Sequence, residues 1–373
     1  MRSRLPAILC VLLALSAFSC AASRRPKNTP PAPSAAPASA QAAPARSPAA
    51  DPSQPAAPRV RLVATGGTIS NRTGGRLSAE ELVKSIPALP RYATPEFEQF
   101  ANVASSELTL PQWLGLARRI NELFRADAAL AGAVVTSGTD TLEELAYFLD
   151  LTVRDPRPVV VVGSMRNPST LGYEGAANLL EGFRVAAEPA AKGRGVMVVL
   201  NDEINAAREV TKTDALRLHT FQSRAYGILG VVDSDRVVFY RRDERRHTQN
   251  SEFDITLVND LPRVDVIVTY QGASGDLINA AVDGGAKGIV IATAGAGATS
   301  GTQSEGLRYA TTKGVYVVMT TRTGGGRIAG GRAGRGTTIA GEDLAPIKAR
   351  ILLMVALTKT QDAAELRRIF AEY

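Results

Sequence analysis

Short apolar runs alternate with amphipathic segments from residue 59 to the end of the chain. The runs are rich in β-branched residues and are apolar throughout, which is typical of parallel strands buried on both faces. We predict strands at 60–64, 132–136, 158–162, 195–200, 264–269, 288–292 and 315–319. The i, i+3, i+4, i+7 spacing of Leu142, Leu145, Ala146 and Leu149 predicts one of the intervening helices. Such alternation indicates a doubly wound α/β fold, in which ligands bind at the carboxyl ends of the strands.

A polar, charged segment at about 241–262 interrupts this alternation and lacks early strand or helix periodicity. We therefore predict two domains, a larger one at 59–240 and a smaller α/β one at 262–373, joined by a linker at 241–261.

The first residues predict a secretion signal at 1–20. Two arginines precede an apolar stretch at 5–18, which is too short to cross a bilayer as a helix. Small residues before Cys20 resemble a lipoprotein cleavage box, and ordinary cleavage near Ala22 is the alternative. We expect export across the inner membrane to the periplasm, with a possible membrane tether through a lipidated Cys20.

Residues 21–58 predict an extended, disordered spacer. They hold ten of the chain's 21 prolines and fourteen alanines, a composition that cannot bury a core. A spacer directly after a lipidated cysteine would act as a tether.

Composition narrows the available chemistry. The only cysteines, Cys10 and Cys20, precede the predicted domains, and the chain has two histidines, His219 and His247, which we interpret as structural. These counts argue against a cysteine nucleophile, a disulfide, a His/Cys metal site and a serine–histidine triad. The charge of +7 is dispersed and aromatics make up only 5%, so we expect no nucleic-acid surface. Hydroxyl groups, carboxylates and lysine remain as candidate catalytic groups.

The first predicted strand ends in VRLVATGGTIS, residues 60–70. Thr65 and Thr68 bracket two glycines there. A hydroxyl at a strand end is a good position for a nucleophile, but it is also a common way to begin a turn.

The strand at 132–136 ends similarly, in a tight turn that contains Gly138, Thr139 and Asp140 before a helix. Asp140 could cap that helix, with Glu143 completing a capping box. The turn also directs free N–H groups and a positive helix end at one point, which suits a carboxylate or an oxyanion.

A third segment places Lys212 between two threonines in VTKTD. By itself it would be a surface lysine. Beside a buried threonine and an aspartate it could act as a base or as a charge that activates a hydroxyl.

Four motifs occur in the same order in a known protein family. TGGTI, GTDTLEE, VGSMRNP and LNDEINAAREVTKT, followed by the closing segment KARILLMVALTKTQDAAELRRIFAEY, resemble the secreted bacterial-type L-asparaginases and glutaminase-asparaginases. The resemblance runs from about Val60 to Tyr373. It implies a flavodoxin-like larger domain, a smaller α/β domain, and homotetramers whose sites lie at the intimate dimer interface. It also implies no metal or organic cofactor, and hydrolysis of L-asparagine, and of L-glutamine as a possible second substrate.

Carried over by motif, the resemblance makes Thr65 the nucleophile and makes Thr139, Asp140 and Lys212 the group that activates a hydroxyl or water. The division of roles between the two threonines stays open. Ser105 matches the residue that holds the substrate α-carboxylate, and Asp140 also holds the α-ammonium. Gly138 and Ser164 belong to the expected substrate site, where N–H groups near Thr139 and Ser164 form the oxyanion hole.

The chain departs from this family in the substrate pocket. The lid loop after TGGTI is short and has no tyrosine before Tyr92, and Ser106 replaces a Gln or Glu, with Glu107 the nearest acid. Asn167 and Glu174 replace a proline and an aspartate, and TRTGGGRIAGGRAG lacks the glutamate that a neighbouring subunit usually contributes. Two alternatives therefore stay open, an amidase for a related amide and a catalytically weak amino-acid-binding surface protein.

Overall fold

The structure, a computed structural model, describes residues 56–329 and 336–373, which belong to one compact unit. The predicted signal at 1–20, Cys20 and the spacer up to residue 55 lie outside the described residues. Within the described ranges, none of the helices has the length and apolarity that a membrane crossing requires.

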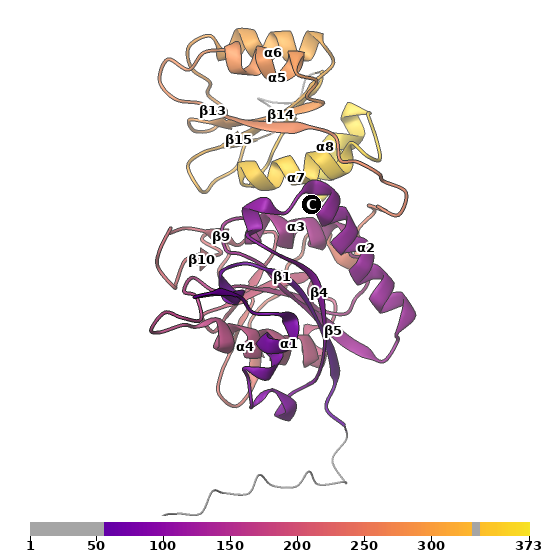
Figure 1. Cartoon of the computed structure of the whole chain (residues 1–373). Coiled ribbons are helices and arrows are strands. Elements are labelled where there is room, and N and C mark those ends of the chain that lie inside the picture. The colour runs from indigo at the N-terminus through magenta and orange to yellow at the C-terminus, as the bar shows by residue number, and fades with distance from the viewer. Residues whose placement is uncertain (1–55, 330–335) are drawn as a thin grey trace, which may run out of the picture. The chain divides into compact units, whose positions relative to one another are not determined.

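The first part of the chain builds an eight-stranded sheet whose central strands are parallel (Figure 1). Its order is β12-β11-β8-β7-β6-β5-β1-β4, and the strands from β7 to β4 all run in the same direction. Strands β8, β11 and β12 extend it with antiparallel pairs. The strands are β1 (Arg59–Gly66), β4 (Thr94–Val103), β5 (Leu130–Thr136), β6 (Val159–Val162), β7 (Val196–Leu200), β8 (Glu203–Ala206), β11 (Gly230–Val232) and β12 (Val237–Phe239).

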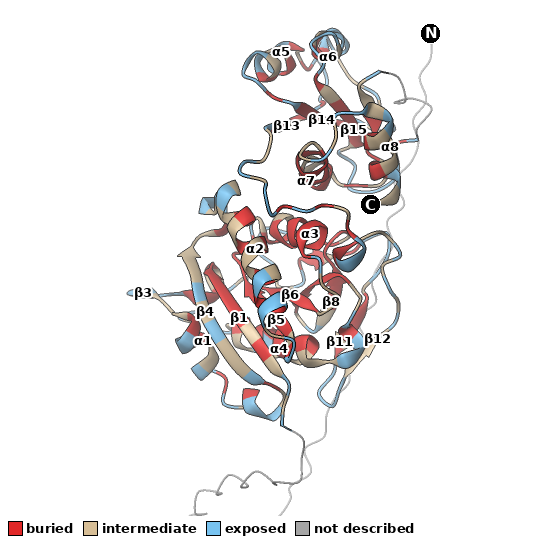
Figure 2. Cartoon of the chain, turned by 90° about the vertical axis from the view of Figure 1, so that its right-hand side faces the viewer, coloured by how far each residue is buried: buried red, intermediate tan, exposed pale blue. Residues whose placement is uncertain are grey.

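Helices cover both faces of this sheet. Alternate residues of a strand point to opposite faces, so Val135 packs with α2 and α3, whereas Val134 packs with α1 and α4. The sheet interior is therefore buried on both sides, as Figure 2 shows for β1, β5 and β6. The helices are α1 (Ala79–Lys84), α2 (Leu110–Ala126), α3 (Leu142–Thr152) and α4 (Gly175–Ala187).

A second, smaller sheet follows. It is wholly parallel, in the order β13-β14-β15-β16, with α5 and α6 on one face and α7 and α8 on the other (Figure 1). Its elements are β13 (Val264–Val268), α5 (Asp276–Asp283), β14 (Gly288–Thr293), α6 (Gln303–Thr312), β15 (Tyr316–Thr321), β16 (Thr338–Ala340), α7 (Pro346–Ala356) and α8 (Ala363–Glu372). The predicted fold class and all seven predicted strands are confirmed, with ends shifted by one or two residues.

The order β4-β1-β5-β6-β7 is the flavodoxin-like order, in which the chain leaves β1 for one neighbour and returns to pair with the other. Ligands bind at such a switch point, outside the carboxyl ends of the two central strands. Here those ends belong to β1, which ends with Thr65 and Gly66, and to β5, which is followed by Ser137 and Gly138.

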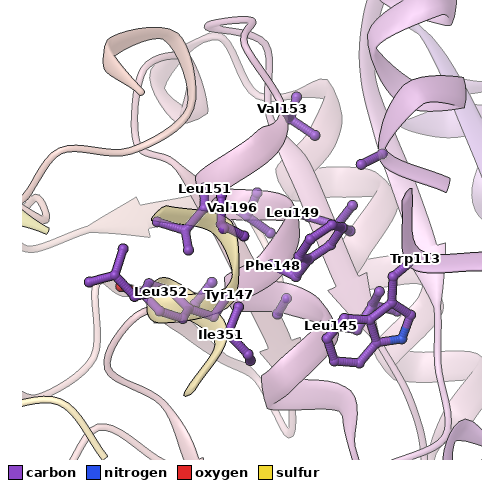
Figure 3. Close-up of a cluster of buried hydrophobic side chains, with 14 of the residues drawn as sticks. Trp113, Leu145, Tyr147, Phe148, Leu149, Leu151, Val153, Val196, Ile351 and Leu352 are labelled. Carbon is purple, nitrogen blue, oxygen red and sulfur yellow. The ribbon is translucent and has the colours of Figure 1, made fainter. Parts of the chain in front are cut away.

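Helix α3 is the most buried helix of the larger sheet, and its apolar side chains pack against both sheet and helix neighbours. Figure 3 shows Tyr147 and Phe148 of α3 between Trp113 of α2 and Ile351 of α7. The rings of Trp113 and Phe148 lie 5.4 Å apart in a tilted arrangement. This packing fixes the helix whose N-terminus follows Thr139 and Asp140.

Asp150 gives α3 a pH-dependent contribution to stability. It is buried, and its Oδ1 accepts a hydrogen bond from the N–H of Val196 at 2.7 Å. Burial raises the pKa of Asp150 to about 7, against an opposing effect of nearby His247. The folded protein therefore holds this proton more tightly than the unfolded chain, so the contribution is full in acid and is lost as pH rises to about 7.

We expect Asp150→Asn, which keeps the acceptor oxygen but stays neutral, to remove this dependence. As pH rises from about 4 to 7.5, the free energy of unfolding of the variant should increase relative to that of the wild type by on the order of 3 to 4 kcal/mol. Urea unfolding of both proteins across that range measures the difference. A stability difference that does not change with pH would contradict the assignment.

Candidate active site

Thr65 lies at the carboxyl end of β1, beside the end of β5. Its N–H donates to Thr136 Oγ1 at 3.2 Å, and its own Oγ1 donates to the Thr136 carbonyl at 2.6 Å. Both threonines are buried. These bonds tie the Thr65 hydroxyl to the strand that leads, three residues later, to Thr139.

The two glycines after Thr65 are required by geometry. Gly66 and Gly67 have φ of +104° and +89°, a conformation that residues with side chains rarely adopt. A Cβ on Gly67 would overlap the backbone of Gly138, and one on Gly66 would overlap that of Val103. The turns after β1 and β5 therefore touch, backbone to backbone.

Gly67→Ala should destabilise the protein by about 3 kcal/mol, because the added methyl group forces the two turns apart at a strained φ. Gly74→Ala is the matched control, since its φ is +85° but nothing lies within 4 Å of an added Cβ. It should cost only about 1 kcal/mol. Urea unfolding compares the two variants, and equal losses would show that the contact with Gly138 is unimportant.

Lys212 joins Thr139 and Asp140 in one polar cluster. It ends the short strand β9 (Thr211–Lys212), which pairs with β10 (Phe221–Gln222). Its Nζ lies 3.1 Å from Thr139 Oγ1 and 2.7 Å from Asp140 Oδ1. Thr139 is buried and the Asp140 side chain is 77% exposed, so the cluster opens to solvent on the Asp140 side.

The predicted capping box of Asp140 and Glu143 is wrong. The N-cap of α3 is Thr141, and it has no side-chain cap. Asp140 turns to Lys212 instead, and Glu143 accepts from the N–H of Lys212 at 3.0 Å. Contacts with β9 determine the positions of both side chains. Because β9 is distant in sequence, the local sequence could not predict these contacts.

Ser105 reaches the same place from the turn after β4. It is buried, and its Oγ accepts from the Thr141 N–H at 3.3 Å and lies 2.9 Å from an ideal Cβ on Gly138. Ser106 is exposed on the same 3-10 turn, Ser105–Glu107. The Glu107 carboxylate accepts from the Ala104 N–H at 3.2 Å, so it caps its own turn.

Ser164 follows β6 and is buried, but its hydroxyl donates to the Arg166 carbonyl at 2.7 Å within its own loop. Glu174 accepts from the N–H groups of Met165 and Arg166. The replacement of aspartate by glutamate thus keeps a carboxylate that fixes this loop. The structure places Ser164 beside the site through Gly163, where an added Cβ would lie 3.3 Å from Thr139 Cγ2.

Tyr173 was not predicted from the sequence as part of this region. Its hydroxyl donates to the carbonyl of Ile69 at 2.9 Å, on the 3-10 turn Thr68–Ser70 that begins the segment after β1. Ser169 Oγ accepts from the Thr73 N–H at 2.9 Å at the tip of the same segment. This segment has no tyrosine of its own, and Tyr173, which follows VGSMRNP in the sequence, contacts it. The loop bears no periodic signal that could have predicted this.

The two histidines lie outside this cluster. His247 is buried, with its Nδ1 3.0 Å from Thr248 Oγ1. His219 is exposed in a loop, so the segment LRLHTF around it is not the helix that its sequence suggests. Within residues 56–329 and 336–373, no group of three or more His, Cys, Asp or Glu side chains could hold a metal ion.

The arrangement combines a buried hydroxyl, an ammonium in contact with a second hydroxyl and a carboxylate, and the N-terminus of the 11-residue helix α3. A hydroxyl beside a lysine can be activated as a nucleophile, and a helix N-terminus stabilises a carboxylate or an oxyanion. These parts suit acyl transfer on a small, charged amide.

Comparisons with known proteins agree with this chemistry. The model of the asparaginase N-terminal domain matches residues 59–245, and that of the glutaminase/asparaginase C-terminal domain matches residues 263–370. L-asparaginase 2 of Bacillus subtilis (strain 168) is 42% identical, over 85% of this chain and 87% of its own. The glutaminase-asparaginase of Pseudomonas fluorescens biotype A is 37% identical, over 84% and 90%. The crystal structure of a probable cytoplasmic L-asparaginase from Campylobacter jejuni superposes with a TM-score of 0.78 at 37% identity, covering 85% of this chain and 100% of that one.

Proposed function

Because the chain belongs to the asparaginase family of amidohydrolases, we propose that it hydrolyses the side-chain amide of L-asparagine to L-aspartate and ammonia. The observation that supports this most is the contact of Lys212 Nζ with Thr139 and Asp140, next to the strand end that carries Thr65.

In the proposed mechanism, Thr65 Oγ attacks the amide carbon and forms a tetrahedral oxyanion. The C–N bond then breaks, ammonia leaves, and an aspartyl ester remains on Thr65. Water attacks this ester and releases L-aspartate and the free hydroxyl. The cluster of Thr139, Asp140 and Lys212 takes the proton of each attacking oxygen, and a proton is returned to the leaving group.

The proposed substrate site holds a small zwitterion. Ser105 and the N-terminus of α3 face the α-carboxylate, and the exposed carboxylate of Asp140 pairs with the α-ammonium. Gly138, Ser106 and Ser164 complete the site. N–H groups near Thr139 and Ser164 stabilise the oxyanion.

L-glutamine is proposed as a second substrate, because one relative of similar identity is named a glutaminase-asparaginase. The alternative activity, on a related amide, is motivated by the replacement at Ser106 and by the acid that TRTGGGRIAGGRAG lacks.

Ammonia release by the purified full chain tests the proposal, with L-asparagine, L-glutamine and D-asparagine as substrates and a chelator present. Release from L-asparagine with equimolar L-aspartate supports the proposed activity and gives the substrate ratio. A folded protein that releases ammonia from none of the three would contradict it.

We also propose the domain boundaries, the export and the oligomeric state that the sequence predicts. The domains at 59–240 and 262–373 with their linker at 241–261, export to the periplasm with a tether at Cys20, and the homotetramer all follow from sequence and resemblance. A relative from Haemophilus influenzae is named a probable periplasmic L-asparaginase, whereas the Campylobacter jejuni protein is named a probable cytoplasmic one. Fractionation with radiolabelled palmitate tests the tether, and sedimentation tests the tetramer.

A further inference from the structure

Lys348 of helix α7 is a buried lysine that the proposed mechanism does not use. Its side chain is 1% exposed, and its Nζ donates to the carbonyls of Ala207 at 2.6 Å, of Arg208 at 3.0 Å, and of Val210. These carbonyls belong to the turn that leads directly into β9. The three N–H bonds of one ammonium therefore fix the chain just before Thr211 and Lys212.

Glu143 of α3 binds strand β9 itself. Its Oε1 accepts from the N–H of Lys212 at 3.0 Å and from Thr211 Oγ1 at 3.1 Å. Its Oε2 has no hydrogen-bond partner among the described residues and lies 4.0 Å from Lys348 Nζ. A buried carboxylate and a buried ammonium thus face each other and both bind the backbone around β9.

Strand β9 needs such support. It has two residues, and so has its partner β10, so the ladder itself fixes the position of Lys212 weakly. The Lys212 ammonium must nevertheless stay within hydrogen-bond reach of Thr139 and Asp140. A misplacement of about 1 Å at a reacting group can cost on the order of 100-fold in rate.

The two supports come from different parts of the chain. Glu143 stands on the helix that follows Thr139 and Asp140, and Lys348 stands on α7, which lies within the C-terminal match at 263–370. Figure 3 shows Ile351 and Leu352 of α7 packed against α3. Burying two charges is costly, and a well-packed apolar pair would serve stability at least as well, so a role in geometry explains the pair better.

We propose that Glu143 and Lys348 are positioning residues, which hold the backbone of Lys212 so that its ammonium meets Thr139 and Asp140. The position of the Lys212 ammonium would then depend on α7, the helix on the smaller sheet that carries Lys348. The proposal rests on the proposed function, because Lys212 is assigned there to proton transfer.

Steady-state kinetics of Glu143→Ala and Lys348→Met in the full chain test the proposal. Both should lower kcat for L-asparagine by about 30-fold and change KM by less than about 3-fold, because the chemistry depends on the position of Lys212. Glu143→Gln, which keeps an acceptor for the Lys212 N–H, should recover most of kcat. If Lys348→Met does not fold, the two Glu143 variants carry the test alone.

Leu353→Ala is the matched control for loss of stability. Leu353 lies on the same helix, is fully buried, and faces Gly288 of the smaller sheet rather than β9. Its melting temperature should fall at least as far as that of Lys348→Met, while kcat well below melting stays within about 2-fold of the wild type. An equal loss of kcat in Leu353→Ala, or wild-type kcat in Glu143→Ala, would overturn the proposal.

A crystal structure of Glu143→Ala separates this proposal from the proposed function. Lys212 Nζ should lie beyond hydrogen-bond distance of Thr139 and Asp140 in that variant. An unmoved Lys212 would overturn the positioning role whether or not the wild type hydrolyses L-asparagine. Absence of wild-type turnover would instead refute the proposed function.

Discussion

Thr65→Ala is expected to lower the turnover of L-asparagine by at least about 1,000-fold, because it removes the proposed nucleophile. The fold should survive, since the Thr65 N–H that bonds Thr136 Oγ1 is a backbone group. Only the hydrogen bond from Thr65 Oγ1 to the Thr136 carbonyl is lost. Ammonia release measures the rate, and circular dichroism with urea unfolding checks the fold.

Thr65→Ser is the control for this prediction, because it keeps a hydroxyl on the same backbone. It should retain measurable turnover, reduced by the looser rotamer of serine. Turnover in Thr65→Ala at the wild-type rate would exclude Thr65 as the nucleophile.

Lys212→Met is expected to lower kcat by about 1,000-fold and to change KM by less than about 5-fold, within the range of general acid–base catalysis. Methionine keeps the length of the side chain but removes the ammonium that contacts Thr139 Oγ1 and Asp140 Oδ1. The loss should therefore appear in the chemical step and not in substrate binding. Steady-state kinetics separates the two constants.

Lys84→Met is the matched control, because Lys84 is an exposed lysine paired with Glu80 on α1. It should leave both constants unchanged. An effect of Lys212→Met on KM alone would contradict the role in proton transfer and would make Lys212 a substrate-binding residue.

The sequence predicts the central strands of the larger sheet well because they are apolar on both faces, as β6 illustrates with four consecutive buried valines. It does not predict β4, whose residues are half-buried or exposed at the edge of the sheet and alternate with charges. Nor does it predict the antiparallel β8, β11 and β12, which have three or four residues each. Their pairing depends on neighbours distant in sequence, which periodicity does not record.

The site shows the same division. Strand ends followed by glycine place Thr65 and Thr139 at the same edge of the sheet, because the carboxyl ends of parallel strands meet there. The partners of Glu143 and Tyr173 depend on contacts across 69 and 104 residues of sequence. Lys348 is more distant still, 138 to 141 residues from the carbonyls that it binds. Local propensity contains no information about such contacts.

Trapping of the acyl-enzyme would identify the nucleophilic threonine. The full chain, turning over saturating L-asparagine, would be quenched in acid within milliseconds, digested and examined by mass spectrometry. We expect an aspartyl ester on the peptide that contains Thr65, and no ester in Thr65→Ala. An aspartyl ester on Thr139 instead would contradict it and would reverse the roles of the two threonines.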